Sequence, residues 1–266
     1  MMPAIFRRLL PIALLCMLPT LAFAQGFSIL VSPPRFEDSA KAGTTYRNVI
    51  EINNTFAQPT HMSVKTADWT LGADGGVNFS DALAPDSCRP WAGIEANEVA
   101  FAGKGKRRFR FEVAIPANAP SGECRFAIML EGDPQAVKGN VPVPVSGRIG
   151  VIVYLAIGDA QPQLDVAGTK TTTQQGRTIP VLKIHNGGNA HGRLEGFIDG
   201  RDASGRKFTF VPSNLPILRG ETRDIALVPQ GDNDATAAAA ITYPLTLKGQ
   251  LDYGSRHLAV DASIAR

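Results

Sequence analysis

Short segments in which apolar and polar residues alternate recur along most of this chain of 266 residues. In the segment 107–116, RRFRFEVAIP, the apolar residues Phe109, Phe111 and Val113 alternate with charged ones. Successive side chains of an extended strand point to opposite faces, so this spacing predicts a strand with one buried face. The same pattern returns in CRFAIML at 124–130. Alternation of this kind, without any long helical pattern, favours an all-β fold.

Two further segments of the first half alternate in the same way. They are YRNVIEI at 46–52 and HMSVKTADWTL at 61–71, and the second is followed by Asp74-Gly75-Gly76. An Asp-Gly pair between such segments is a strong signal for a tight hairpin turn. Because strand-like segments recur about every ten residues, the first half is predicted to form a β-sandwich.

A second group of strand-like segments begins after the apolar run VYLAI, which ends in Gly158 and Asp159. The remaining segments are joined by Asn-Gly, Ser-Gly and Tyr-Gly turns, and together they match the size of one immunoglobulin-like sandwich. The sequence therefore predicts an all-β protein made of two tandem immunoglobulin-like β-sandwiches. We place the first domain at 25–158 and the second at 159–266.

The segment 1–24 has the features of a signal peptide that is removed after export. Two arginines precede an apolar stretch at 9–21, and AFA at 22–24 is a small-x-small cleavage site. The apolar stretch is too short to span a bilayer, and no later stretch has the length of a transmembrane helix. These features predict a mature chain that begins at Gln25, is exported to a bacterial periplasm and does not insert into a membrane.

Export determines how the cysteines are interpreted. Of the three, Cys16 leaves with the signal peptide, so Cys88 and Cys124 remain in an oxidising compartment. The alternation of 124–130 puts Cys124 on the apolar face of its strand. We therefore expect a disulfide between Cys88 and Cys124, with two separate buried thiols as the alternative.

The chain carries no recognisable catalytic motif. A formal net charge of +3 is too small to predict nucleic-acid binding, and neither a nucleophile elbow nor a phosphate-binding or dinucleotide-binding glycine loop occurs. His185 and His191 flank the segment HNGGNAH, but no acidic residue or cysteine within it completes a metal site. We interpret this segment as a turn, and the sequence predicts a non-enzymatic protein without catalytic, cofactor-binding or metal-binding residues.

Several segments of the first domain, taken in order, carry a family resemblance. They are LVSPPRFEDSAKAG from Leu30, YRNVIEINNTFAQP from Tyr46, TADWTLGADGGVNF from Thr66, SCRPW from Ser87 and PWAGIEANEVAFAGKGKRRFRFEVAIP from Pro90. This series resembles the PapD-like periplasmic chaperones of pilus assembly, and is most similar to a divergent proteobacterial branch of that family. The resemblance implies two immunoglobulin-like domains, no enzymatic activity and secreted pilus or fimbrial subunits as partners, with an outer-membrane usher as a further candidate partner.

In that family two basic residues, one on the first strand and one on the last strand of the first domain, hold the C-terminal carboxylate of a pilus subunit between the domains. Arg35 matches the first by position, and a guanidinium can bind a carboxylate in a bidentate pair. The alternative is that Arg35 extends along an edge strand with its charged end in solvent. The second position falls on Val151, and Arg148 is the nearest cation. A shift of three residues reverses the face unless Gly147 or Gly150 forms a bulge.

The segment GNVPVPVSGRIGVIVYLAI, the predicted last strand of the first domain, also carries a row of alternating apolar residues. The resemblance implies that this row is donated to an incomplete pilus subunit. The row comprises Val141, Val143, Val145, Ile149, Val151 and Val153. Pro142 and Pro144 lack N–H groups on one side of the strand, so they either face a neighbouring strand or block the outer edge. A core strand with a protected edge is the alternative.

The function that follows from the resemblance is a periplasmic chaperone that stabilises pilus or fimbrial subunits by strand donation and carboxylate anchoring. The alternative function is a structural or adhesive periplasmic protein that has the same fold but does not bind the C-terminus of a pilus subunit.

Overall fold

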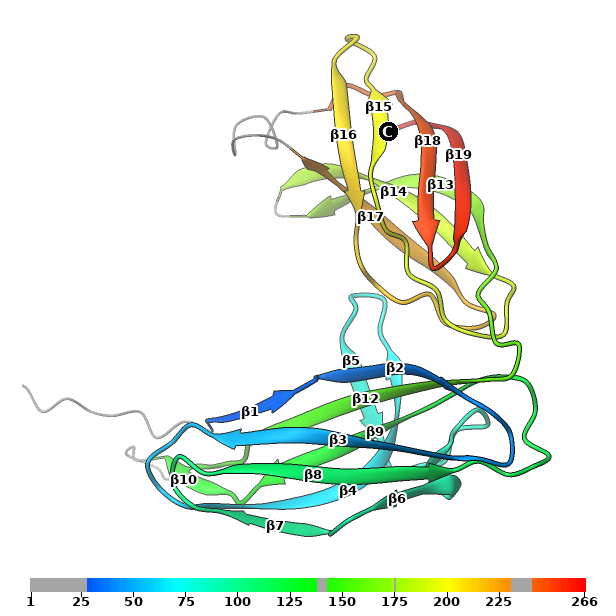
Figure 1. Cartoon of the computed structure of the whole chain (residues 1–266). Helices are drawn as coiled ribbons and strands as arrows, with labels where there is room; N and C mark the ends of the chain where they lie inside the picture. The colour runs from blue at the N-terminus through cyan, green and yellow to red at the C-terminus, as the bar shows by residue number, and fades with distance from the viewer. Residues whose placement is uncertain (1–27, 138–142, 175, 231–240) are drawn as a thin grey trace, which may run out of the picture.

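The computed structural model describes residues 28–137, 143–174, 176–230 and 241–266, with the side chains of 135–145 left out. In this part of the chain β-strands form two sandwiches, which confirms the predicted fold class (Figure 1). The predicted signal peptide, 1–24, lies outside the described residues, as does Val141. Among the described residues no helix has the length and apolar character needed to cross a membrane.

The first domain is built from two facing sheets. One contains, in spatial order, β1 (Ile29–Ser32), β3 (Thr45–Asn54), β8 (Lys106–Ala114) and β6 (Ala92–Ile94). The other contains β2 (Arg35–Ala40), β12 (Arg148–Ile157), β9 (Gly122–Gly132), β4 (Thr60–Leu71) and β5 (Val77–Ser80), and β7 (Glu98–Phe101) also pairs with β4. The chain crosses between the sheets at Pro33 and Pro34, which have no N–H group to give to either ladder.

Alternation places the core of the first domain where the sequence predicts it. Phe109, Phe111 and Val113 of β8 face inward and are buried, as are Phe126 and Ile128 of β9. The charged residues between those of β8 point to the outer face of that sheet. Between Phe126 and Ile128 of β9 lies Ala127, which is buried on the other face in the apolar cluster with Trp69. The core of this domain is therefore the layer between the sheets.

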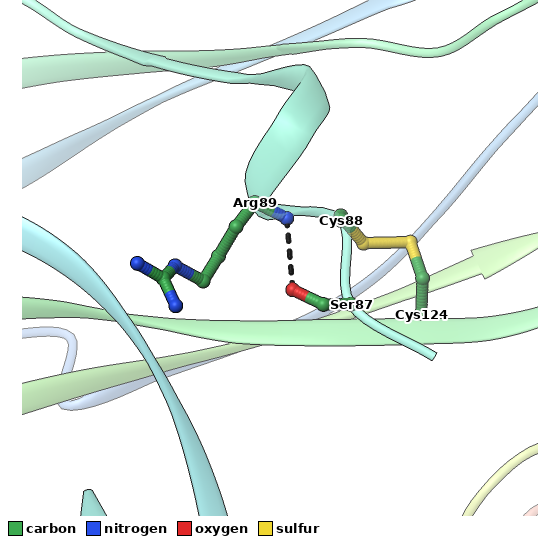
Figure 2. The surroundings of a disulfide bond; sticks show 4 residues. All are labelled: Ser87, Cys88, Arg89 and Cys124. Carbon is green, nitrogen blue, oxygen red and sulfur yellow. Dashed lines mark hydrogen bonds between the residues drawn. A yellow bond between two sulfur atoms is a disulfide. The ribbon is translucent and has the colours of Figure 1, made fainter. Parts of the chain in front are cut away.

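The Cys88–Cys124 disulfide is present, so this prediction is confirmed (Figure 2). Cys124 lies on the buried face of β9, and its Cα atom is 5.4 Å from that of Cys88. Cys88 immediately precedes a short 3₁₀ helix, η1 (Arg89–Trp91), whose first N–H donates to Oγ of Ser87 at 3.0 Å. The disulfide thus fixes the loop between β5 and β6 to the core.

The second domain is also a sandwich. Its strands follow the order β13 (Leu164–Gln174), β14 (Arg177–Asn186), β17 (Thr222–Gln230), β16 (Lys207–Pro212), β15 (Ile198–Arg201), β18 (Leu245–Tyr253) and β19 (Arg256–Ile264). The first half of β17 pairs with β14 and its second half pairs with β16, so this strand passes from one layer to the other. A separate apolar core lies between the layers.

The predicted last strand of the first domain, 139–157, is interrupted in its described part. Val143–Val145 forms β11, which pairs with β10 (Gln135–Val137) in a two-stranded sheet of its own. The break falls at Ser146 and Gly147, and β12 starts at Arg148. From there to Ile157 the register with β9 is regular, so no bulge occurs at Gly150.

Reduction of the disulfide should destabilise the first domain. The bond closes a loop with a sequence separation of 36, and the loss of that restraint on the unfolded chain corresponds to about 4 kcal/mol before strain and residual structure are considered. We expect a clear fall in the urea midpoint when the purified protein is treated with a reductant. Alkylation and mass spectrometry of the non-reduced protein should find no free thiol at either position; two free thiols would contradict the assignment.

Candidate functional site at the domain interface

Strand β2 brings Arg35 and Glu37 to the outer face of the first domain. Phe36, which lies between them, is buried in the core, so its two neighbours point the opposite way. The parallel pairing of β2 with β12 places Arg35 opposite Ile152 and Glu37 opposite Tyr154. A charge stands between Pro34 and Phe36 because this position faces away from the core and toward the second domain.

The second domain contributes His191 and Arg193 from the loop between β14 and β15. Gly192 forms a bridge with Ile217 through hydrogen bonds of 3.1 and 2.8 Å. Its neighbours His191 and Arg193 therefore project to the same side of the extended loop. A side chain at Gly192 would lie 2.9 Å from Cβ of Pro162, so this tight packing requires glycine.

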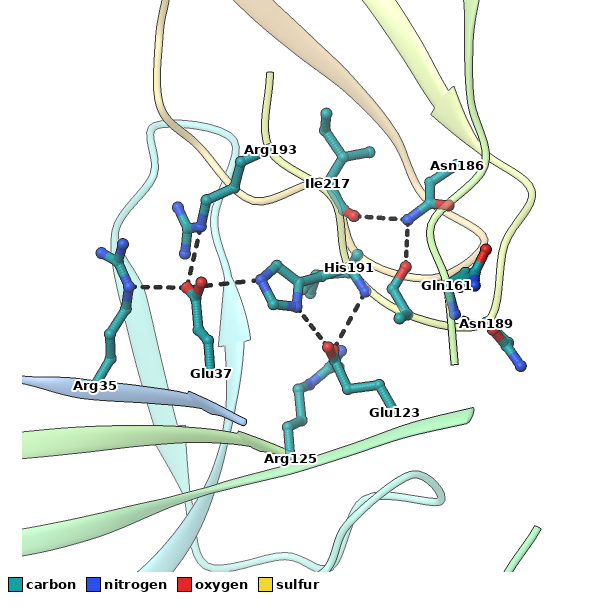
Figure 3. A network of polar contacts seen from close by, with 12 residues as sticks. Arg35, Glu37, Glu123, Arg125, Gln161, Asn186, Asn189, His191, Arg193 and Ile217 are labelled. Carbon is teal, nitrogen blue, oxygen red and sulfur yellow. Dashed lines mark hydrogen bonds and ion pairs between the residues drawn. The ribbon is translucent and has the colours of Figure 1, made fainter. Parts of the chain in front are cut away.

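The carboxylate of Glu37 is the meeting point of these side chains (Figure 3). Its Oε1 atom lies 2.8 Å from Nε of Arg35 in the same strand and 3.2 Å from Nε of Arg193 in the second domain. Nε2 of His191 is 3.6 Å from the same oxygen. One acidic group of the first domain thus connects to two basic groups of the second.

His191 is the most enclosed member of this network. Its Nδ1 atom is 2.5 Å from Oε2 of Glu123, and its backbone N–H donates to Oε1 of the same carboxylate at 3.3 Å. The imidazole stacks on the ring of Tyr154 with a centroid distance of 4.0 Å. Only 10% of the His191 side chain is exposed. A cationic imidazole between Glu37 and Glu123 contacts both carboxylates, and Arg35 and Arg193 bring further positive charge to Glu37.

These contacts change the pKa values of Glu37 and His191 in opposite directions. The contact with His191 is the largest influence on Glu37 and, with the charges of Arg193 and Arg35, it outweighs burial and lowers the pKa of Glu37 to about 2. Burial lowers the pKa of His191, but the contacts with Glu123 and Glu37 outweigh it, and the net effect raises this pKa above its usual value. Burial also raises the pKa of Tyr154. Near neutral pH Glu37 is therefore ionised.

A second contact between the domains involves the hairpin of β4 and β5, whose tip points toward the second domain in Figure 1. The buried Arg223 donates to the carbonyl of Gly72 at 2.8 Å and to that of Leu71 at 3.2 Å. Leu218 of the second domain packs in one apolar cluster with Trp69 and Tyr154. The two domains are thus joined by an ionic contact at Glu37 and by a separate contact at the hairpin.

The hairpin also packs over β12. The ring of Phe79 lies on Gly150, where an added Cβ would be 2.6 Å from Cε1 of the ring. Phe79 and Ile152 pack against the apolar cluster that contains Trp69. Gly150 therefore provides the space that the hairpin needs to cover this face of the sheet.

The other predicted cation, Arg148, is not part of the site at Glu37. Arg148 pairs with Glu131 at 2.8 Å and lies four residues before Ile152, the partner of Arg35. At the rise of a strand this offset is about 13 Å. Both arginines lie on the outer face of the sheet, but the structure does not bring them together.

The apolar row of the predicted donor strand has a different position from the expected one. Val151 and Val153 are fully buried in the first domain's own core, and Ile149 is partly buried against it. In the free protein Val151 and Val153 are therefore core residues, and their predicted contact with a partner stays a prediction. Val143 and Val145 lie in β11, apart from this row.

One edge of β12 is open at its beginning. On the side where β2 pairs, the register starts at Ile152, and among the described residues no strand pairs with Arg148–Val151 on that side. The N–H of Ile152 donates to the carbonyl of Pro34 at 3.2 Å. Since N–H groups two residues apart point the same way, those of Arg148 and Gly150 face the open side.

Sequence reasoning missed Glu37, Glu123, His191 and Arg193 as site residues. Glu37 follows Arg35 by two positions, a spacing that puts both on one face of a strand, and this signal is present in the sequence. The residues HGR at 191–193 adjoin a segment with the composition of a turn, and nothing local indicates their partner. Among the described residues no group of three or more histidine, cysteine, aspartate or glutamate side chains could hold a metal ion.

No family model and no curated protein matches this chain. Solved structures do show a likeness. The class 5 fimbriae chaperone CfaA matches at 11% identity and a TM-score of 0.48, covering 90% of this chain and 100% of its own. The chaperone CsuC in its pre-assembly complex with CsuE, from archaic chaperone-usher pili of Acinetobacter baumannii, matches at 14% identity and a TM-score of 0.44. This match covers 90% of this chain and 98% of the other. The CupB2 chaperone of Pseudomonas aeruginosa matches at 11% identity and a TM-score of 0.45, covering 90% of this chain and 100% of its own.

The interface at His191 should respond to pH in a defined direction. The raised pKa of His191 stabilises the docked domains below its usual value of 6.5, and this stabilisation is lost as the pH rises through the raised pKa. The lowered pKa of Glu37 stabilises them above 4.5, and this contribution is lost as the pH falls toward about 2. The groups facing His191 are Glu37, Glu123, Tyr154 and Arg193.

Thermal unfolding midpoints measured against pH test this expectation. The difference between the wild type and His191→Gln should be largest between pH 4.5 and 6.5 and should shrink at higher pH. His257→Gln is the control, because it removes an exposed histidine whose contact with Asp252 lies within the second domain. A constant difference across this range would contradict the assigned role of His191.

The packing of Phe79 on Gly150 predicts a compensating pair of substitutions. Gly150→Ala should destabilise the protein by about 1–3 kcal/mol, because the ring or the strand must move. In a Phe79→Ala background the same change should cost much less. Gly93→Ala is a control, since its added Cβ would have an ordinary contact of 3.5 Å with Glu112. Equal costs in both backgrounds, measured by urea unfolding, would show that the two residues are not coupled.

Proposed function

We propose that this chain is a non-enzymatic periplasmic chaperone that binds secreted pilus or fimbrial subunits. The observation that carries the proposal is the position of the open edge of β12. This edge, Arg148–Val151, ends where β2 begins, at Arg35 opposite Ile152. A client strand that occupies the edge in line with β2 therefore ends next to a guanidinium.

The edge determines the direction of such a strand. Strand β2 runs parallel to β12 and pairs with it from Ile152 onward. A client strand that pairs with Arg148–Val151 lies on the same edge, ahead of the start of β2. Its C-terminus can therefore reach Arg35 only if the client strand also runs parallel to β12. Backbone hydrogen bonds to Arg148 and Gly150 provide sequence-independent affinity. The terminal carboxylate then fixes the register through a charge-assisted contact.

Arg35 is accessible enough for this role. Its side chain is 47% exposed, and its Nε atom is engaged by Glu37. The other donors of this guanidinium have no hydrogen-bond partner among the described residues.

In the proposed mechanism the apolar contacts with the client come from β11 and Ile149, while Val151 and Val153 support the strand from the core.

One observation favours the alternative function, a structural or adhesive protein of the same fold. Arg35 already forms an ion pair with Glu37, so its charge has a partner without any client. The two functions differ in what the chain carries after purification. A chaperone should be recovered from the periplasm with a small β-rich secreted protein in near-equal amounts, whereas recovery without such a protein would favour the alternative.

Arg35→Ala should separate binding from folding. The ion pair with Glu37 is half-exposed, so its loss should change stability by no more than about 1 kcal/mol. Loss of a carboxylate contact in a shielded interface should weaken client capture more than tenfold, in line with about 2–5 kcal/mol for such contacts. Arg47→Ala, which breaks the exposed pair with Glu112 on the other sheet, is the matched control. An early-melting Arg35→Ala protein with normal capture would overturn the anchoring role.

Two substitutions at Arg148 test strand pairing. Arg148→Ala removes only the side chain, whereas Arg148→Pro also removes the N–H that faces the open side. Capture of the client that co-purifies with the wild type should survive the first change and fall at least tenfold with the second, while both proteins keep the wild-type melting temperature within a few degrees. Equal capture by both variants would show that no client strand pairs at this edge.

A further inference from the structure

Two arginines from different domains flank one carboxylate in the free protein. Nε of Arg35 and Nε of Arg193 both contact Oε1 of Glu37, at 2.8 and 3.2 Å. Arg193 also donates through Nη1 to the carbonyl of Asn214 at 2.8 Å, which holds the guanidinium in place. The two guanidinium groups together form a carboxylate-binding site, because they already bind the carboxylate of Glu37.

Arg193 provides a second cation beside Arg35, a position at which β12 itself has no cation. The outer-face residue of β12 beside Arg35 is Ile152, and Arg148 is about 13 Å away along the strand. Arg193 is separated from Glu37 by 156 positions in the sequence but contacts the same oxygen as Arg35. The second cation therefore comes from the second domain.

Exposure decreases from one side of this site to the other. The side chains of Arg35 and Glu37 are 47% and 34% exposed, whereas that of Arg193 is 12% exposed. A carboxylate from outside can thus approach on the side of Arg35. Glu37 is held only by its own backbone in β2 and by ionic contacts, so its side chain can rotate away without breaking the β2–β12 ladder.

We propose that Glu37 is an internal occupant of a carboxylate site formed by Arg35 and Arg193, and that a peptide C-terminal carboxylate binds by taking its place. The identity of this ligand rests on the proposed function, whereas the site and its internal occupant do not. Because Glu37 is tethered beside both arginines, it competes at a high effective concentration. Binding is therefore weaker than the arginine pair alone would allow, which favours release of a bound chain.

Acetate is a minimal probe of this site. In Glu37→Gln the carboxylate is replaced by a neutral amide of the same shape, so the arginine pair has no anionic occupant. NMR titration of the arginine Nε–H signals should show acetate binding at Arg35 and Arg193 at least tenfold tighter in Glu37→Gln than in the wild type. Acetamide, the neutral analogue, should produce no such response. Adding Arg193→Ala to Glu37→Gln should return acetate binding to the wild-type level.

Glu112→Gln is the matched control, because Glu112 pairs with Nε of Arg47 at 3.0 Å on the far sheet and within one domain. It should leave the acetate response of Arg35 and Arg193 unchanged. Equal acetate affinity in the wild type and Glu37→Gln, or no response at both arginines in Glu37→Gln, would overturn the proposal. If Glu37→Gln loosens the domain interface, Glu37→Ala offers a second readout: acetate, and not acetamide, should raise its melting temperature more than that of the wild type.

The outcome can be separated from that of the proposed function. Acetate binding that depends on Glu37→Gln supports the site even if no client is recovered from the periplasm, in which case only the chaperone role fails. Conversely, if a client is captured but acetate does not bind to Glu37→Gln, the chaperone role stands and the assigned carboxylate site is wrong. If both hold, Glu37→Gln should capture the client more tightly than the wild type does.

Discussion

The parallel register between β2 and β12 determines which side chains of the first domain reach the second. With Arg35 opposite Ile152 and Glu37 opposite Tyr154, both charges share a face with the aromatic ring on which His191 stacks. A shift by one residue would turn Phe36 outward and both charges into the core. The same register leaves Arg148–Val151 without a partner strand on that side among the described residues, so the ionic interface and the open edge have a common origin.

The interface at His191 combines unfavourable desolvation with favourable ionic and stacking contacts. Burying His191 beside two carboxylates requires removal of water from all three groups. This is offset by the contacts of the imidazole with both carboxylates, by the charge of Arg193 and by stacking on Tyr154. An interface of this kind gives a defined geometry more than a large stability. The contact at Glu37 can therefore exchange one carboxylate for another while Arg223 and the β4–β5 hairpin keep the domains together.

Much of the fold was predictable from the sequence, because strand alternation is a local property. The spacing of Phe109, Phe111 and Val113 identifies a buried face without any knowledge of the partner strand. The same logic places Cys124 on the core side, and the disulfide with Cys88 is present. The same alternation puts Val151 and Val153 on one face of β12, but it does not say whether that face meets the protein's own core, where the structure places both side chains, or a partner.

What the sequence determined by itself is the division into most of the strands and turns, the two sandwiches and the alternation that sets Arg35 and Phe36 on opposite faces of a strand. What only the tertiary structure decided is which groups surround that arginine. Arg193 and Glu37 are 156 positions apart, and their contact depends on the register of β2, on the bridge that orients the loop around Gly192 and on the docking of two separately folded cores. None of these is encoded in a local pattern, because electrostatic contacts between domains depend on distances that are set only when both domains have folded.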